Sequence, residues 1–286
     1  MTTEKKKGAK SFKKKVVAPT GIASVDQLAD LSDTECTIDV YVRAASEYVR
    51  RSHELKLGPK KAAQIRLSNA LGRALVADLK VRIPSLRDVV IGERKVSGAL
   101  RSVNADVSEI HSTDGLRLAV ELKPVNLAVG RAIWNRFGDI RTFAVNLHLK
   151  FPFCVVGGVL AIPTYEATGS KKEIEEEVAD EASLSEQVDE ASLEILVGVE
   201  ADEPVPQSMA HKSTVHLINR AVARLVRAGG RRTEGDAPHL LEGIAVVVYD
   251  PDSGMLHADL PATGSGLRWS EFVDAIATTY QSRFEL

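Results

Sequence analysis

Hydrophobic residues recur at every third or fourth position in several stretches of the chain, and this spacing predicts amphipathic helices. Helices are expected over residues 25–57 (one or two helices), 59–78, 128–149, 211–228 and 269–284. The expected apolar side of the helix over 59–78 is formed by Ile65, Leu67, Leu71 and Leu75. The residues of the helix over 128–149 that share one face, and should lie in the core, are Ile133, Phe137, Ile140, Ala144 and Leu147.

Strands are indicated where hydrophobic and polar residues alternate, or where a short run is continuously apolar. The stretch 103–125 predicts two strands joined at Asp114-Gly115, a dipeptide that favours tight hairpin turns. Further strands are expected over residues 151–162 and 243–250. Helices and strands mixed in this order predict an α/β fold with a central mixed sheet flanked by helices.

Composition divides the chain into four parts. These are a lysine-rich tail (1–20) expected to be disordered, the N-terminal helices and hairpin-bearing core (21–165), an acidic linker or insertion (166–207), and a C-terminal part that completes the α/β domain (208–286). Two alternatives stay open for the acidic part: a solvated insertion, or an internal mimic of DNA. The tail could contact phosphates or only aid solubility.

The net charge of −2 hides an uneven distribution. From Glu173 to Glu203 there are thirteen Asp or Glu residues and no Lys or Arg. Outside this stretch 37 basic residues stand against 26 acidic ones, a net charge of +11. A basic body with one concentrated acidic segment suits a protein that binds a polyanion such as DNA.

Other features exclude several classes of protein. No apolar stretch approaches the roughly 20 residues of a membrane span. The N-terminus lacks the apolar core of a signal peptide. Cys36 and Cys154 are too few and too far apart for a disulfide framework or a cysteine metal cluster. A soluble cytoplasmic protein without membrane partners is therefore expected.

The hairpin over 103–125 carries the most informative polar residues. Side chains two positions apart on a strand point to the same face, so Glu121 and Lys123 should project together. Asp106 can approach that face from the neighbouring strand. Two carboxylates and a lysine are thus expected to meet at one edge of the sheet. This combination suits a divalent metal ion with a cation beside it, as hydrolysis of a phosphodiester requires.

The arrangement of Asp106 with Glu121-Leu122-Lys123 resembles the active-site hairpin of the PD-(D/E)XK nuclease superfamily, which includes most type II restriction endonucleases. Ala105 stands where that family often has proline. The resemblance covers roughly residues 96–163. It implies a restriction-endonuclease-like fold, double-stranded DNA as substrate, Mg²⁺ as cofactor and a homodimer. It further implies that Asp106, Glu121 and the backbone carbonyl of Leu122 hold Mg²⁺, and that Lys123 orients or helps deprotonate the attacking water.

Other residues compete for these roles or add to them. Asp114 could replace Asp106 as a ligand, but a turn residue should lie at the far end of the hairpin. Glu93 is a candidate for an additional acidic group, whereas Glu109 should point away from Asp106. Candidates for DNA contacts, or for supporting the side chains of the site, are Asn126, Arg131, Asn135, Arg136 and Arg141. The exposed pair Arg231-Arg232 is a further loop candidate for DNA contacts. His148 is expected to interact with the C-terminal end of its helix.

These observations support a type II restriction endonuclease as the first hypothesis. A repair or mobile-element nuclease that reads DNA structure is the second. A nuclease-like fold that only binds DNA or a protein is the third, and a scaffold without a nucleic-acid partner is the fourth. Mg²⁺-dependent cleavage separates the first two hypotheses from the others.

Overall fold

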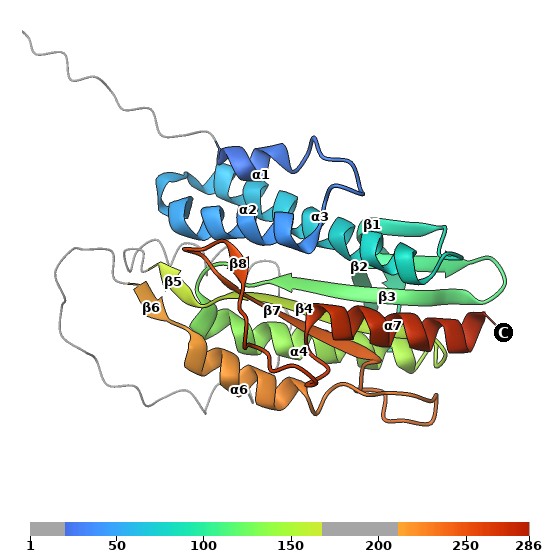
Figure 1. Ribbon diagram of the computed structural model, residues 1–286. Helices are drawn as coiled ribbons and strands as arrows, with labels where there is room; N and C mark the ends of the chain where they lie inside the picture. Colours follow the sequence, from blue (N-terminus) through green and yellow to red (C-terminus); the bar gives the residue numbers. More distant parts are fainter. Residues whose placement is uncertain (1–20, 168–210, 286) are drawn as a thin grey trace, which may run out of the picture.

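The computed structural model describes residues 21–167 and 211–285 (Figure 1). The predictions for the lysine-rich tail and for nearly all of the acidic part lie outside these residues. Residues 166 and 167 are described, and they belong to a short strand. No helix of the described ranges is long and apolar enough to cross a membrane.

Helices and strands follow one another along the chain. The helices are α1 (Ala23–Gln27), α2 (Ile38–Arg51), a 3₁₀ turn (Ser52–Glu54), α3 (Leu57–Arg82), α4 (Val129–His148), α6 (Val215–Leu225) and α7 (Trp269–Phe284). The strands are β1 (Val89–Ser97), β2 (Ser102–His111), β3 (Gly115–Pro124), β4 (Val155–Pro163), β5 (Tyr165–Ala167), β6 (His211–Ser213), β7 (Gly243–Asp250) and β8 (Met255–Leu256).

A six-stranded mixed sheet in the order β1-β2-β3-β4-β7-β8 forms the centre of the fold. Strands β1, β2 and β3 are antiparallel neighbours, β3, β4 and β7 are parallel, and β8 is antiparallel to β7. Helix α4 connects the parallel strands β3 and β4, as a crossover between parallel strands requires. Strands β5 and β6 pair separately. The predicted mixed α/β architecture is confirmed.

Two hydrophobic cores lie on the two faces of this sheet. Helices α1, α2, α3 and α7 cover one face, where they enclose Val107, Val120 and Leu122. Helices α4 and α6 cover the other face, against Ala119 and Leu160. In Figure 1, α1–α3 lie above the sheet and α4 and α6 below it. Because both faces are covered, strand β4 is buried along its whole length.

The local predictions were correct in most places and wrong in three. The strand predicted from residue 151 begins at Val155, since residues 152 and 153 form a turn. The helix predicted from residue 211 begins at Val215, since residues 211–213 pair as β6. Ile65, predicted on the apolar side of the helix, is 63% exposed, because the buried face of α3 passes through Leu67 and Leu71 instead.

Candidate active site at the end of the β2–β3 hairpin

Glu121 and Lys123 lie on one face of β3, and Nζ of Lys123 forms an ion pair with Oε1 of Glu121. Val120 and Leu122 face the opposite layer, in the core beneath α3 and α7. The predicted alternation along β3 is therefore confirmed. The polar pair lies on the side of the sheet that carries α4.

Asp106 reaches the same place from β2. The ladder between β2 and β3 ends at the pair Val107–Val120. Just beyond it, Oδ2 of Asp106 accepts a hydrogen bond from the backbone N–H of Leu122 at 2.6 Å. The carboxylate takes the position that a backbone carbonyl of β2 would have in a continued ladder. Asp106 is thereby fixed where the two strands separate, beside Glu121.

The backbone carbonyl of Leu122 adds an oxygen to the place where β2 and β3 separate. In an extended strand the N–H and C=O groups of one residue point to the same side. Since the N–H of Leu122 points at Asp106, its carbonyl is directed toward the same side of β3. No group of three or more His, Cys, Asp or Glu side chains within residues 21–167 and 211–285 is arranged to hold a metal ion. Any ion here would depend on the two carboxylates, this carbonyl and water.

A bulge in β1 brings Glu93 to the margin of the site. The register between β1 and β2 shifts between Ile91 and Arg94, and Gly92 within the bulge has φ +100°, which L side chains rarely adopt. Exposed Glu93 accepts a hydrogen bond from Nδ2 of Asn104 at 3.2 Å. Its charge contributes to raising the pKa of Asp106.

The two carboxylates are electrostatically under-compensated. Burial raises the pKa of Glu121 to about 7, and repulsion from Asp106 and Asp139 acts in the same direction, while Lys123 opposes it. Burial and the charge of Glu93 also raise the pKa of Asp106, against the Leu122 N–H and Lys123. Carboxylates that share a site with too little positive charge favour the uptake of a cation or a proton.

Lys123 experiences the opposite balance. Burial alone would lower its pKa, but the charge and hydrogen bond of Glu121, together with Asp106 and Asp139, outweigh burial and raise the pKa. The amine is therefore a cation at neutral pH. Asp139, on α4, was not singled out in the sequence. The one feature of the local sequence that could have drawn attention to Asp139 is its position three residues after Arg136, with which it forms an ion pair at 3.3 Å.

The structure separates the proposed DNA-contacting residues into two groups. Arg131, Asn135 and Arg141 are exposed on α4, and Arg136 is half-buried. Asn126 is 4% exposed, and its Oδ1 accepts a hydrogen bond from the Tyr249 hydroxyl at 2.9 Å. A side chain held in this way cannot reach DNA, so Asn126 has a structural position. The turn residue Asp114 pairs with Arg117 at the other end of the hairpin.

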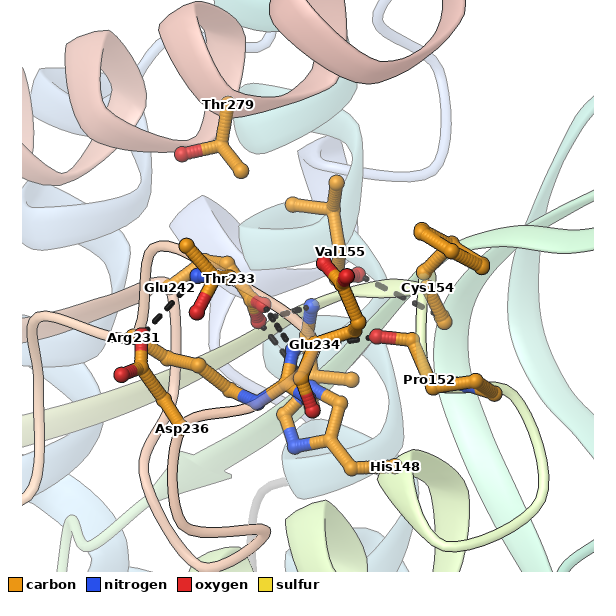
Figure 2. Close-up of polar contacts among 12 residues, drawn as sticks. His148, Pro152, Cys154, Val155, Arg231, Thr233, Glu234, Asp236, Glu242 and Thr279 are labelled. Carbon is orange, nitrogen blue, oxygen red and sulfur yellow. Dashed lines mark hydrogen bonds and ion pairs between the residues drawn. The ribbon is translucent and has the colours of Figure 1, made fainter.

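A second buried carboxylate belongs to Glu242, which directly precedes β7. In space it lies beside the start of β4 and the end of α4 (Figure 2). Its oxygens contact His148 Nε2 at 3.1 Å, Arg231 Nη1 at 3.0 Å and Arg283 Nη1 at 2.9 Å. The N–H of Val156 donates to it at 2.8 Å. Burial alone would raise the pKa of Glu242, but His148, the Val156 N–H and Arg283 hold it below its usual value.

This cluster corrects two predictions. Arg231 was expected in an exposed loop, yet it is only 2% exposed, because its guanidinium donates to the buried carboxylate of Glu242. His148 was expected to interact with the C-terminal end of its helix, whereas its ring bridges Glu242 and the carbonyl of Pro238. The partners of His148 are 90 and 94 residues away and the carboxylate beside Arg231 is 11 residues away, so local polarity gave no signal of burial. Comparisons of the chain with protein-family models, with curated proteins and with solved structures found no match.

Proposed function

We propose that this chain is an Mg²⁺-dependent nuclease of the PD-(D/E)XK type that hydrolyses phosphodiester bonds in double-stranded DNA. One observation carries the proposal: the Asp106 carboxylate is fixed beside Glu121 and Lys123 by the N–H of Leu122 at 2.6 Å. The order of elements supports it, because α4 follows the hairpin and the buried strand β4 then returns parallel to β3. A restriction-endonuclease-like fold is part of the same proposal.

The oxygens at the site fit Mg²⁺ in number and type. Mg²⁺ prefers oxygen ligands, keeps several waters and binds through one or two carboxylates plus substrate phosphate. Asp106, Glu121 and the Leu122 carbonyl would hold the ion. Burial and repulsion from neighbouring carboxylates raise the pKa of both groups, and a bound cation would relieve both effects. When bound, Mg²⁺ would polarise the scissile phosphate and make water a stronger nucleophile.

The side chains divide the remaining tasks. Lys123 is protonated, so it donates hydrogen bonds to the attacking water or to the phosphate and offsets the negative charge that develops. Glu121, with a pKa of about 7, holds a proton at mildly acidic pH and must release it before it can act as a ligand. Cleavage should therefore increase as the pH rises through 7.

Within this proposal, a type II restriction endonuclease acting as a homodimer is the first reading, and a structure-specific repair or mobile-element nuclease is the alternative. A second function, DNA binding without catalysis, is favoured by one observation. Within residues 21–167 and 211–285 no three His, Cys, Asp or Glu side chains are grouped to hold a metal ion, and Lys123 is already paired with Glu121.

The test is incubation of the purified chain with supercoiled plasmid and Mg²⁺, with EDTA as the control. Asp106→Asn and Lys123→Ala should each lower the cleavage rate by about 100-fold or more, as expected when a group that stabilises the transition state is removed. Discrete fragments would indicate a restriction enzyme, whereas a smear or cleavage only at branched DNA would indicate the alternative.

Glu109→Gln provides the matched control. Glu109 lies on the same strand as Asp106 but faces the opposite layer, where it accepts a hydrogen bond from Tyr280 at 2.6 Å. The Gln side chain can still accept that bond, so cleavage should persist. Cleavage that survives both Asp106→Asn and Lys123→Ala would refute the site. If the wild type binds DNA but does not cleave it, the nuclease proposal is refuted and DNA binding without catalysis is supported.

A further inference from the structure

The exposed face of α6 is basic and free of acidic residues. From Lys212 to Arg232 the chain contains six Lys and Arg residues and no Asp or Glu. The buried positions of α6 are Ile218, Ala221 and Leu225. The basic residues on its exposed side are Arg220, Arg224 and, just after the helix, Arg227. The charge is therefore on one side, directed away from the core.

Trp134 of α4 holds two of these arginines in place. The guanidinium of Arg224 lies 4.5 Å from the centre of the Trp134 ring, and that of Arg220 lies 5.4 Å from it. An arginine over an aromatic ring loses conformational freedom, while the N–H groups along its edge remain able to donate. The indole thus presents two ordered sets of donors at one place.

The same arrangement concentrates positive charge without neutralising it. Arg220 and Arg224 are one helical turn apart, and like charges at this spacing repel each other. Neither forms an ion pair with a carboxylate of residues 21–167 or 211–285. A polyanion that lies across both guanidinium groups would remove this repulsion. A phosphate backbone, with about one negative charge per 1.7 Å of duplex, has the required charge density.

This surface continues toward the candidate active site. Helices α4 and α6 lie side by side on the same face of the sheet (Figure 1). On α4, residues three or four apart share a side, so Arg131 lies beside Trp134 and beside Asn135, and both Arg131 and Asn135 are exposed. Farther around the same helix, Asp139 is close enough to act on the charges of Glu121 and Lys123.

We propose that Arg220, Arg224 and Arg227 on α6, with Arg131 on α4, bind the phosphate backbone of double-stranded DNA away from the reacting phosphate. The choice of DNA as the polyanion rests on the proposed function. These contacts position the duplex across α4 and carry no base recognition of their own.

The test measures binding of the full-length chain to a fluorescein-labelled 20-base-pair duplex in EDTA, by anisotropy, over a series of NaCl concentrations. The double variant Arg220→Gln/Arg224→Gln should bind more weakly than the wild type. The slope of log K against log[NaCl] should fall by about 2 in magnitude, since each lost phosphate contact removes about 0.9. Arg220→Lys/Arg224→Lys keeps both charges and should keep most of the slope.

Lys80→Gln/Arg87→Gln is the matched control, because it removes two exposed positive charges on the side of the sheet that carries α3. It should retain the slope of the wild type. Equal losses in both Gln double variants, or no loss in either, would overturn the proposal. A thermal melt confirms that each variant is folded. The assay contains no Mg²⁺, so a chain that binds through α6 but never cleaves would refute only the nuclease.

Discussion

Glu121 and Glu242 are both buried glutamates on the α4 side of the structure, but their surroundings differ. Glu121 has one lysine beside it and a second carboxylate nearby, and its pKa rises to about 7. Glu242 is contacted by His148, Arg231, Arg283 and a backbone N–H, and its pKa falls. One site lacks positive charge, and the other has a full complement of donors.

This difference distinguishes a structural carboxylate from one that is available for chemistry. A buried charge that is fully hydrogen-bonded and paired keeps its partners fixed, and removing it leaves them unpaired. A buried carboxylate with incomplete compensation destabilises the protein unless a proton or a metal ion joins it. Sites that bind ligands often keep such a deficit, at the expense of stability.

The largest effect is expected from removing the charge of Glu242. Glu242→Gln leaves His148, Arg231 and Arg283 beside a neutral amide in a buried cluster. The free energy of unfolding at pH 7 should fall by about 3–5 kcal/mol, as for other broken buried ion pairs. Urea unfolding followed by circular dichroism measures this change. Glu109→Gln, which keeps an acceptor for Tyr280, should lose no more than about 1 kcal/mol. Equal losses of unfolding free energy in Glu242→Gln and Glu109→Gln would show that the Glu242 cluster is no more sensitive than another buried glutamate.

The pH dependence of stability should differ in sign between the two glutamates. The folded pKa of Glu121 is raised from 4.5 to about 7, so its contribution to stability is complete below pH 4.5 and is lost as the pH rises through 7. The loss corresponds to about 3 kcal/mol. The contribution of Glu242, whose folded pKa is lowered, is present above pH 4.5 and is lost as the pH falls below that value.

Glu121→Gln should therefore remove the loss of stability between pH 4.5 and pH 7, and it should leave the acid limb unchanged. The measurement is the urea midpoint at intervals of half a pH unit for the variant and the wild type. A variant whose stability still falls over that window, by as much as the wild type, would show that Glu121 is not the titrating group.

The smallest effect is expected from Mg²⁺. At ten times its dissociation constant, an ion that binds only the folded chain adds about 1.4 kcal/mol, which corresponds to a rise of about 3 °C in Tm. The shift should be larger at pH 8 than at pH 6, because Mg²⁺ competes with the proton on Glu121. Asp106→Asn should abolish the shift, and Glu242→Gln should retain it. Salt at matched ionic strength controls for screening.

Much of the candidate site could be predicted because its parts are close in sequence. The Asp114-Gly115 turn fixes the hairpin, and the alternation along β3 places Glu121 and Lys123 on one face. The pattern could not predict that the pairing of β2 with β3 ends at Val107–Val120. Beyond that pair the Asp106 carboxylate, rather than a backbone carbonyl of β2, accepts the hydrogen bond of the Leu122 N–H. This hydrogen bond depends on where the two strands diverge, and no residue type in either strand predicts that point.

The amino-acid sequence by itself determined the local elements, among them α4, β7 and α7, because their spacing of apolar residues repeats over neighbouring positions. Only the tertiary structure decided the environment of each buried charge. His148 meets Glu242 across 94 residues and Val156 meets it across 86. Arg231, polar and flanked by another arginine, is buried because the fold places its guanidinium against Glu242, 11 residues further along the chain. Electrostatic compensation depends on distance in space, and the sequence records only distance along the chain.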